Sequence, residues 1–179
     1  MSEDKIIKTI NPATGKTLET YNHISDAELN SAIEKTQKAF LDWRHQSLEK
    51  RANVIKAIGK KLVEYKDELS KLMTNEMGKI LPQSNQEVDL CAGICKYTAK
   101  KGVEELKDEH RELFSGGKGI VTYSPIGIIY GIQPWNYPSY QVIRYAIVNL
   151  MAGNAVLLKH ASNVTGTGLL LEKIFTEAG

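Results

Sequence analysis

Two short apolar runs with a helical segment between them constrain the fold of this chain more than any other feature. Residues 126–130 and 155–158 have the β-branched and apolar character of strands, and residues 140–150 have the apolar content of a buried helix. Gly153-Asn154 marks a turn before the second run, which suits a parallel strand covered on both faces. Residues 165–178 predict one more helix. This order predicts an α/β fold with a doubly wound sheet whose further strands are not in this chain.

The first part of the chain predicts a hairpin followed by helices. Residues 6–10 and 16–21 alternate as strands do, with turn-forming residues between them. Four signals place the helices: a capping box at 25–28, a start after Ser47, a glycine cap at Gly78 and a second capping box at 84–87. The outer faces of these helices are rich in Lys and Glu, which indicates either a solvated surface or helices that cover a sheet.

The character of the sequence changes after Ser115. Residues 116–119 resemble a phosphate loop but lack its spacing and the Ser or Thr after Lys118, so they predict a flexible connector. The runs 120–123 and 126–130 predict two strands that meet at a bend, because a proline at 125 interrupts strand pairing.

Composition limits the class of protein. The 179 residues, 42% of them hydrophobic and 25% charged, suffice for one domain with its own core. The formal charge of +2 arises from 23 basic and 21 acidic residues mixed along the chain, without the basic, aromatic stripe of a nucleic-acid binder. No apolar run approaches about 18 residues, and residues 1–5 lack the apolar character of a signal peptide. We therefore expect a cytoplasmic protein with neither nucleic acid nor membrane as a partner.

The two cysteines, Cys91 and Cys95, lie four residues apart in a segment with helical periodicity. A disulfide is uncommon in a cytosolic chain, and a catalytic thiol needs an electropositive, partly exposed setting. The four histidines show no ligand spacing, so no metal site is predicted. The pattern favours two buried helical cysteines.

A proline-flanked corner follows the first apolar run. Pro134 and Pro138 restrict the backbone on both sides, so Trp135 and Asn136 are held rigidly at the end of a strand. A carboxamide held there can donate a hydrogen bond to a developing oxyanion without first reorganising. The alternative is a structural turn in which Asn136 caps the next helix and Trp135 fills a gap in the core.

Two cations are further candidates. Lys159 ends an apolar strand, so its ammonium emerges at the carboxyl edge where open α/β sheets bind ligands, and it either binds a ribose or phosphate or is simply exposed. Arg144 lies eight residues after Asn136, which predicts that both side chains share one helical face. Its planar guanidinium suits a substrate carboxylate, and a structural ion pair is the alternative.

Gly166-Thr167-Gly168 follows a predicted strand and opens a helix, as a dinucleotide fingerprint does. Leu171 occupies the place of the third glycine. The pattern therefore favours a glycine-rich helix entry that packs against a sheet.

Several separate motifs together resemble the aldehyde dehydrogenase superfamily, in the same order and over nearly the whole chain. They are Asn11-Pro12-Ala13-Thr14-Gly15, Glu76-Met77-Gly78-Lys79, Pro134-Trp135-Asn136-Tyr137-Pro138 and the run from Gly153-Asn154 to Lys159. The runs Gln141-Val142-Ile143-Arg144 and Leu158-Lys159-His160-Ala161 are similar to succinate-semialdehyde dehydrogenases. The resemblance implies that residues 1–179 are the N-terminal part of a Rossmann-like NAD(P)-binding domain, without the catalytic domain.

The resemblance also implies roles for the matching residues. In the family a cysteine thiolate attacks the aldehyde, hydride passes to NAD or NADP, and a glutamate activates the water that releases the acid. Asn136 matches the amide that stabilises the oxyanion, and Arg144 matches a residue that binds the distal carboxylate of a semialdehyde. The coenzyme site would include Ile132, Pro134, Trp135, Lys159 and Ser162. Ser162 stands where NAD-preferring members commonly carry Glu, so a 2′-phosphate is permitted there.

Two departures from the family pattern accompany the likeness. Tyr145 replaces a frequently basic residue beside the substrate arginine, which argues against a proton relay there. The nucleophilic cysteine and the general-base glutamate would lie beyond Gly179, and neither Cys91 nor Cys95 matches the nucleophile.

Residues 117–131 resemble the β-arm through which family members form dimers and tetramers, so we expect the full-length parent to be a homo-oligomer. The first hypothesis is the N-terminal part of a dehydrogenase that oxidises succinate semialdehyde and is inactive as residues 1–179 alone. The second is a truncated, inactive protein that serves as an assembly or binding partner.

Overall fold

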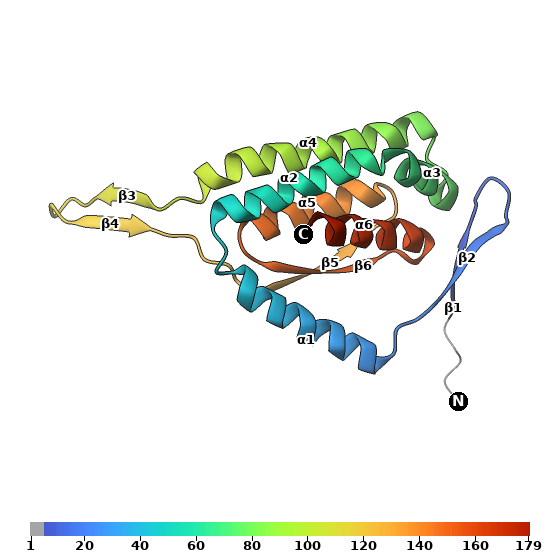
Figure 1. Cartoon of the computed structure of the whole chain (residues 1–179), viewed down its shortest axis with the longest axis horizontal. Helices are drawn as coiled ribbons and strands as arrows, with labels where there is room; N and C mark the ends of the chain where they lie inside the picture. The colour runs from blue at the N-terminus through green and yellow to red at the C-terminus, as the bar shows by residue number, and fades with distance from the viewer. Residues whose placement is uncertain (1–5) are drawn as a thin grey trace.

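The computed structural model describes residues 6–179, so residues 1–5 and the expectation that they form no signal peptide lie outside it (Figure 1). Its elements are β1 (Ile6–Ile10), β2 (Thr17–Asn22), α1 (Asp26–Trp43), α2 (Leu48–Glu64), α3 (Lys66–Met77), α4 (Leu81–Glu105), β3 (Glu109–Glu112), β4 (Lys118–Val121), β5 (Ile128–Gln133), α5 (Pro138–Met151), β6 (Ala155–His160), the 3-10 turn η1 (Ser162–Val164) and α6 (Thr165–Ala178). Among the helices of residues 6–179, none is both long and apolar enough for a bilayer span.

The parallel pair β5–β6 organises the molecule. Ile128 lies opposite Ala155 and Gln133 opposite His160, so the two strands end at the same edge. Helix α5 joins them and packs on both, while α1 contacts β6 from the other side (Figure 1). The predicted strand, helix, strand, helix order is confirmed. The expected cover on both faces of residues 155–158 is incomplete, because Val156 to Leu158 are only half-buried, and Tyr130 and Ile132 of β5 are 59% and 67% exposed.

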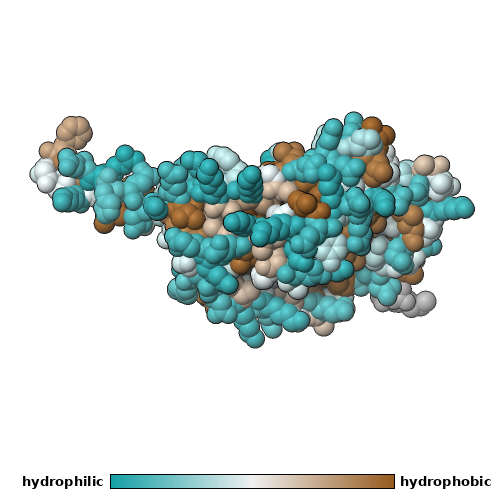
Figure 2. Space-filling model, turned by 45° about the horizontal axis from the view of Figure 1, so that its top comes forward, coloured by the Kyte–Doolittle hydropathy of each residue, from teal (hydrophilic) through white to brown (hydrophobic). Residues whose placement is uncertain are grey.

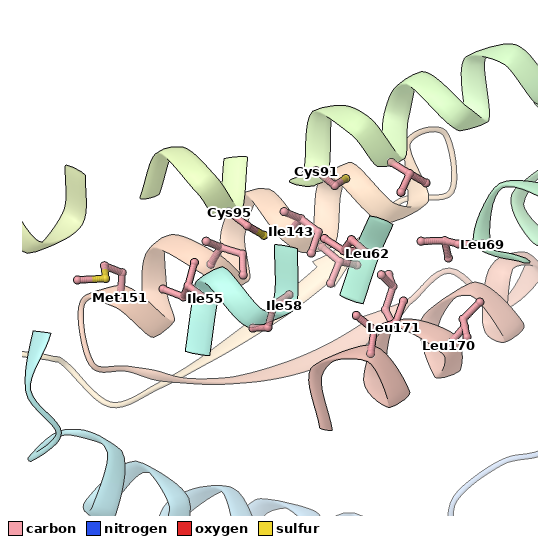
Figure 3. Close-up of a cluster of buried hydrophobic side chains, with 14 of the residues drawn as sticks. Ile55, Ile58, Leu62, Leu69, Cys91, Cys95, Ile143, Met151, Leu170 and Leu171 are labelled. Atoms are coloured by element: carbon pink, nitrogen blue, oxygen red, sulfur yellow. The ribbon is translucent and has the colours of Figure 1, made fainter. Parts of the chain in front are cut away.

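The hydrophobic core lies between α2, α4, α5 and α6 (Figure 3). Ile55, Ile58 and Leu62 place one apolar face of α2 in this core and are at most 1% exposed. Cys91 and Cys95 on α4 are fully buried and free, as the helical spacing predicts. Since burial of apolar surface is the main driving force for folding, this layer holds the sheet in place.

Three helix ends form as the local sequence predicts. At α1, the Ser25 amide donates to Glu28 Oε2 (2.7 Å) and the Glu28 amide to Ser25 Oγ (3.2 Å), which completes the capping box. Ser47 caps α2 through the Lys50 amide (3.1 Å). Gly78 ends α3 with φ +78°, a conformation that glycine adopts without strain.

The prediction of a second capping box at residues 84–87 was wrong. Helix α4 begins at Leu81, because Pro82 in the first turn suits a helix start, and so Ser84 and Glu87 already lie inside the helix. Ser84 Oγ pairs with Thr74 Oγ1 (3.2 Å), and Glu87 turns toward α5. Both residues therefore serve tertiary contacts, which local sequence cannot distinguish from a cap.

The antiparallel hairpin β3–β4 projects from the body of the molecule (Figures 1 and 2). Gly116, at φ +78°, forms its turn, so the glycine-rich segment that was predicted as a connector joins β3 to β4, and its last two residues lie in β4. The predicted arm, 117–131, coincides with the hairpin only in part, because β5 belongs to the central parallel pair. Leu113, Phe114 and Ile120 are at least 50% exposed on the hairpin.

Candidate active site at the carboxyl ends of β5 and β6

The predicted site residues gather at one edge of the parallel pair. Ile132 lies opposite Lys159 near the ends of β5 and β6, and Pro134 and Trp135 follow β5 directly. Ser162 opens the turn after β6. Two segments that are separate in sequence thus meet where open α/β sheets bind ligands.

The Asn136 side chain is exposed and forms no hydrogen bond with any of residues 6–179. Helix α5 has Tyr137 as its N-cap, with no side-chain cap from the corner itself, and Trp135 is 51% exposed. The alternative of a capping Asn136 and a core-filling Trp135 is therefore wrong. The carboxamide is available to a bound molecule.

A buried carboxylate takes the place of a local cap. Glu87 Oε1 accepts hydrogen bonds from the amides of Ser139 and Tyr140, both at 2.9 Å, and Glu87 is only 2% exposed. A carboxylate is favourable at a helix N-terminus because unpaired amides and the helix dipole meet it there. This contact fixes the start of α5, and with it the corner that carries Asn136.

Lys79 completes the support of the corner. Its ammonium forms an ion pair with Glu87 and lies 3.6 Å from the centroid of the Tyr137 ring. Both charged side chains are nearly inaccessible to solvent, at 6% and 0%. The sequence marked Lys79 only as the end of a family motif and Glu87 only as part of a local capping box, because the contacts of Glu87 with α5 link segments that are far apart in the chain.

A cleft of about 730 Å³ runs beside β6, lined by α5, α6 and the residues after β2. Its walls are mainly apolar, and Lys159 and Ser162 line it at the carboxyl end of the strand. Lys159 and Ser162 are both exposed, so this end of the cleft presents an ammonium beside a small neutral side chain. Among residues 6–179, Glu172 is the one carboxylate in the lining, and it lies further along α6.

The start of α6 is closed to phosphate. Glu76 accepts hydrogen bonds from the Gly166 amide (2.8 Å), the Thr167 amide (2.9 Å) and the Thr167 hydroxyl (2.7 Å). Burial raises the pKa of this carboxyl, and the three donors partly offset the shift. A Cβ on Gly166 would lie 2.7 Å from Glu76 Oε1, so this glycine admits a protein carboxylate to the helix end and does not mark a phosphate loop.

Arg144 is exposed on α5, with its guanidinium carbon 5.9 Å from the Tyr140 ring centroid, and it pairs with no carboxylate of residues 6–179. The prediction that Asn136 and Arg144 share a helical face was wrong. The helix begins only at Pro138, so Asn136 lies in the turn before it.

Tyr145 packs against the two parallel strands. Its hydroxyl donates to the Leu157 carbonyl (3.0 Å), and burial raises its pKa to about 12, so it holds its proton at neutral pH. The ring lies against Gly131, where an added Cβ would be 2.2 Å from Tyr145 Cζ.

Neither cysteine has the setting of a nucleophile. Burial raises the pKa of Cys95 to about 12 and raises that of Cys91 further, so both remain protonated thiols. Within the described residues, no group of three or more His, Cys, Asp or Glu side chains could hold a metal ion.

Comparison with known proteins places these features in a family. A model of the aldehyde dehydrogenase family matches residues 1–179. A protein named probable succinate-semialdehyde dehydrogenase (NADP+) in Synechocystis sp. is 41% identical over 173 residues, which are 97% of this chain and 38% of the relative. The succinate semialdehyde dehydrogenase (NAD(P)+) of Escherichia coli is 37% identical over 171 residues, which are 96% of this chain and 37% of the relative.

The fold agrees with a solved structure. The succinic semialdehyde dehydrogenase from Streptococcus pyogenes, in complex with NADP+, superposes with a TM-score of 0.92 at 33% identity and covers 97% of this chain and 38% of that protein. The chain thus spans well under half the length of these relatives. Over its whole length, the chain belongs to the aldehyde dehydrogenase family.

Proposed function

We propose that this chain supplies the coenzyme-binding edge and the oxyanion-stabilising corner of an NADP-dependent dehydrogenase that oxidises succinate semialdehyde to the carboxylic acid. One observation carries the proposal: the Asn136 carboxamide is free and exposed, in a corner held by the buried Glu87. The names of the relatives support the substrate and the coenzyme.

Asn136 acts on the developing charge. Its amide donates a hydrogen bond to the aldehyde oxygen as that oxygen becomes negative, and the clamped corner spares the amide a costly reorganisation. A bound nicotinamide coenzyme would supply the hydride acceptor. Lys159 binds the ribose hydroxyls, the small Ser162 leaves room for a 2′-phosphate, and Ile132, Pro134 and Trp135 line the coenzyme beside the corner.

The proposal places the nucleophilic thiol and the water-activating carboxylate outside residues 1–179. The protonated, buried state of Cys91 and Cys95 supports this assignment. Two buried, unpaired cysteines also support a cytoplasmic location, since reducing compartments keep thiols free.

Association through the β3–β4 hairpin is part of the proposal. The hairpin extends away from the core and carries exposed apolar side chains, which a second copy of the protein would cover. We therefore propose a homo-oligomer.

The test of the oxyanion role is Asn136→Ala in the protein expressed from its own gene, assayed with succinate semialdehyde and NADP. Loss of one preorganised donor should lower kcat by about 10²–10³-fold. Asn53→Ala, an exposed asparagine on α2, is the matched control and should leave kcat unchanged. An unchanged kcat in Asn136→Ala, or no dehydrogenase activity in the natural protein, would overturn the proposal.

The test of the substrate is Arg144→Leu, assayed with a carboxylated and a neutral aldehyde of similar size. Loss of a charge-assisted contact of about 1.5–3 kcal/mol should weaken use of the carboxylated aldehyde by roughly 10- to 100-fold. The neutral aldehyde serves as the internal control. Equal losses for both would remove the assignment of Arg144.

A further inference from the structure

His160, the last residue of β6, contacts both halves of the site. Its Nε2 lies 3.0 Å from the Pro138 carbonyl at the start of α5, and its Nδ1 accepts a hydrogen bond from the Ala161 amide (2.9 Å). The residue before it in β6 is Lys159, and Pro138 is two residues after Asn136. The ring thus links the end of β6, which carries Lys159, to the corner before α5, which carries Asn136.

The two hydrogen bonds favour one tautomer of the ring. An amide N–H can only donate, so Nδ1 carries no proton, and a carbonyl can only accept, so Nε2 carries one. The neutral ring satisfies both partners at once. A protonated ring would lose the contact with Ala161, because both of its nitrogens would be donors. The Ala161 amide would then keep its second acceptor, the Gln133 carbonyl (3.1 Å).

The surroundings favour the neutral ring. Burial is the main cause that lowers the pKa of His160 below its ordinary value of 6.5, and the backbone groups of Pro138 and Gln133 oppose this shift. Two charged groups act on it: Lys159 on the same strand lowers the pKa, and Glu87 from α4 raises it. Gly168 at the start of α6 lies beside the ring, and an added Cβ there would make an ordinary contact with His160 at 3.5 Å.

We propose that His160 is a positioning residue: as the neutral Nε2–H tautomer it holds the corner that carries Asn136 in place against the strand end that carries Lys159. For the reaction, this inference rests on the proposed function. Glu87 holds the same corner from α4, through the amides of Ser139 and Tyr140, and His160 holds it from the sheet. The corner is therefore fixed on two sides.

The direct test is nuclear magnetic resonance of the indole N–H groups. The protein described here has two tryptophans, Trp135 in the corner and Trp43, whose indole donates to the Leu150 carbonyl far from the site (2.9 Å). His160→Ala should shift and broaden the Trp135 resonance and leave Trp43 unchanged. His160→Gln keeps an amide donor for Pro138 and should return Trp135 close to its original position.

A pH titration tests the same contact without substitution. In the natural protein, the Trp135 resonance should stay constant above pH 6.5 and move together with the His160 ring as the pH falls through the lowered pKa. In His160→Gln this movement should be absent. The matched control is His45→Gln, which replaces an exposed histidine after α1. In this variant the Trp135 resonance should move with pH as it does in the natural protein.

Kinetics supply the readout for the reaction. His160→Ala should lower kcat about 10- to 100-fold, the usual effect of misplacing a catalytic group, and His160→Gln should recover most of the loss and lack the acidic limb of the pH profile. The inference would be overturned if the Trp135 resonance changed neither on substitution of His160 nor on acidification. It would also be overturned if the acidic limb of the pH profile of kcat persisted in His160→Gln. If Trp135 responds but no variant and no natural protein oxidises aldehydes, the proposed function fails while the structural link stands.

Discussion

At the scale of single residues, Gly131 shows how closely α5 lies on β5. The Tyr145 ring occupies the space where any larger residue would place its Cβ, and its hydroxyl reaches the Leu157 carbonyl on the neighbouring strand. The aromatic ring therefore connects the helix to both strands of the parallel pair.

Gly131→Ala should destabilise the protein by about 1–3 kcal/mol, because the new methyl group forces the ring away and breaks its hydrogen bond. Urea unfolding measures the loss. Gly93→Ala, in α4 with open space around it, should instead stabilise by up to about 1 kcal/mol. If the ring is the cause, most of the cost should disappear in a Tyr145→Ala background, and an undiminished cost would contradict the explanation.

Residues that act through near neighbours could be predicted from the sequence. The Ser25 capping box and the Gly78 cap depend on groups within four residues. The apolar runs 126–130 and 155–158 predicted the two parallel strands, but the strands end later, at Gln133 and His160. Glu87 and His160 could not be predicted in the same way. Their hydrogen-bond partners lie 52 and 22 residues away, so their roles emerge only when the chain has folded.

At the scale of elements, two helices that border the site receive their N-terminal caps from other helices. Glu87 of α4 caps α5, and Glu76 of α3 caps α6. Each carboxylate is 2% exposed, so each helix start is tied to the core rather than to solvent. These caps orient α5 and α6 relative to the helical layer.

Glu87→Ala should destabilise the protein by about 3–5 kcal/mol, the usual cost of leaving a buried ion without its partner, here Lys79. Two amides of α5 also lose their acceptor. Denaturant unfolding measures this loss. Glu104→Ala on the same helix removes an exposed pair with Lys101 and should have no measurable effect; similar losses in both variants would show that the cap contributes little.

The apparent capping box at 84–87 explains why element boundaries were harder to predict than elements. A Ser followed three residues later by Glu has the same pattern whether it starts a helix or lies within one. Pro82 favoured the earlier start, and the two polar side chains were used in contacts with α3 and α5. The helix itself was predicted correctly because its apolar periodicity extends over many residues.

At the scale of the whole molecule, the β3–β4 hairpin is the element least involved in the core. It extends beyond the helical body, and its apolar side chains stand among hydrophilic ones (Figure 2). Its sequence signal was ambiguous because the same β-branched character occurs in β5, which pairs inside the fold.

Phe114→Lys combined with Ile120→Lys should abolish the proposed self-association, raising the dissociation constant more than about tenfold, while the unfolding midpoint of the body changes little. Sedimentation velocity and thermal unfolding measure the two effects. Leu90→Lys, on the exposed side of α4, serves as the control for added charge. Association that survives the double substitution would exclude the hairpin as the interface.

The cap on α6 has a consequence for protein engineering. A designer who wished to install a glycine-rich diphosphate cradle here would naturally replace Leu171, where the third glycine of that fingerprint would stand. Such a substitution should not create a diphosphate site, because the amides that would bind the anion already donate to Glu76. Leu171 is also a core side chain, 1% exposed. A redesign would first have to replace Glu76 and then restore the packing around the N-terminal end of α6.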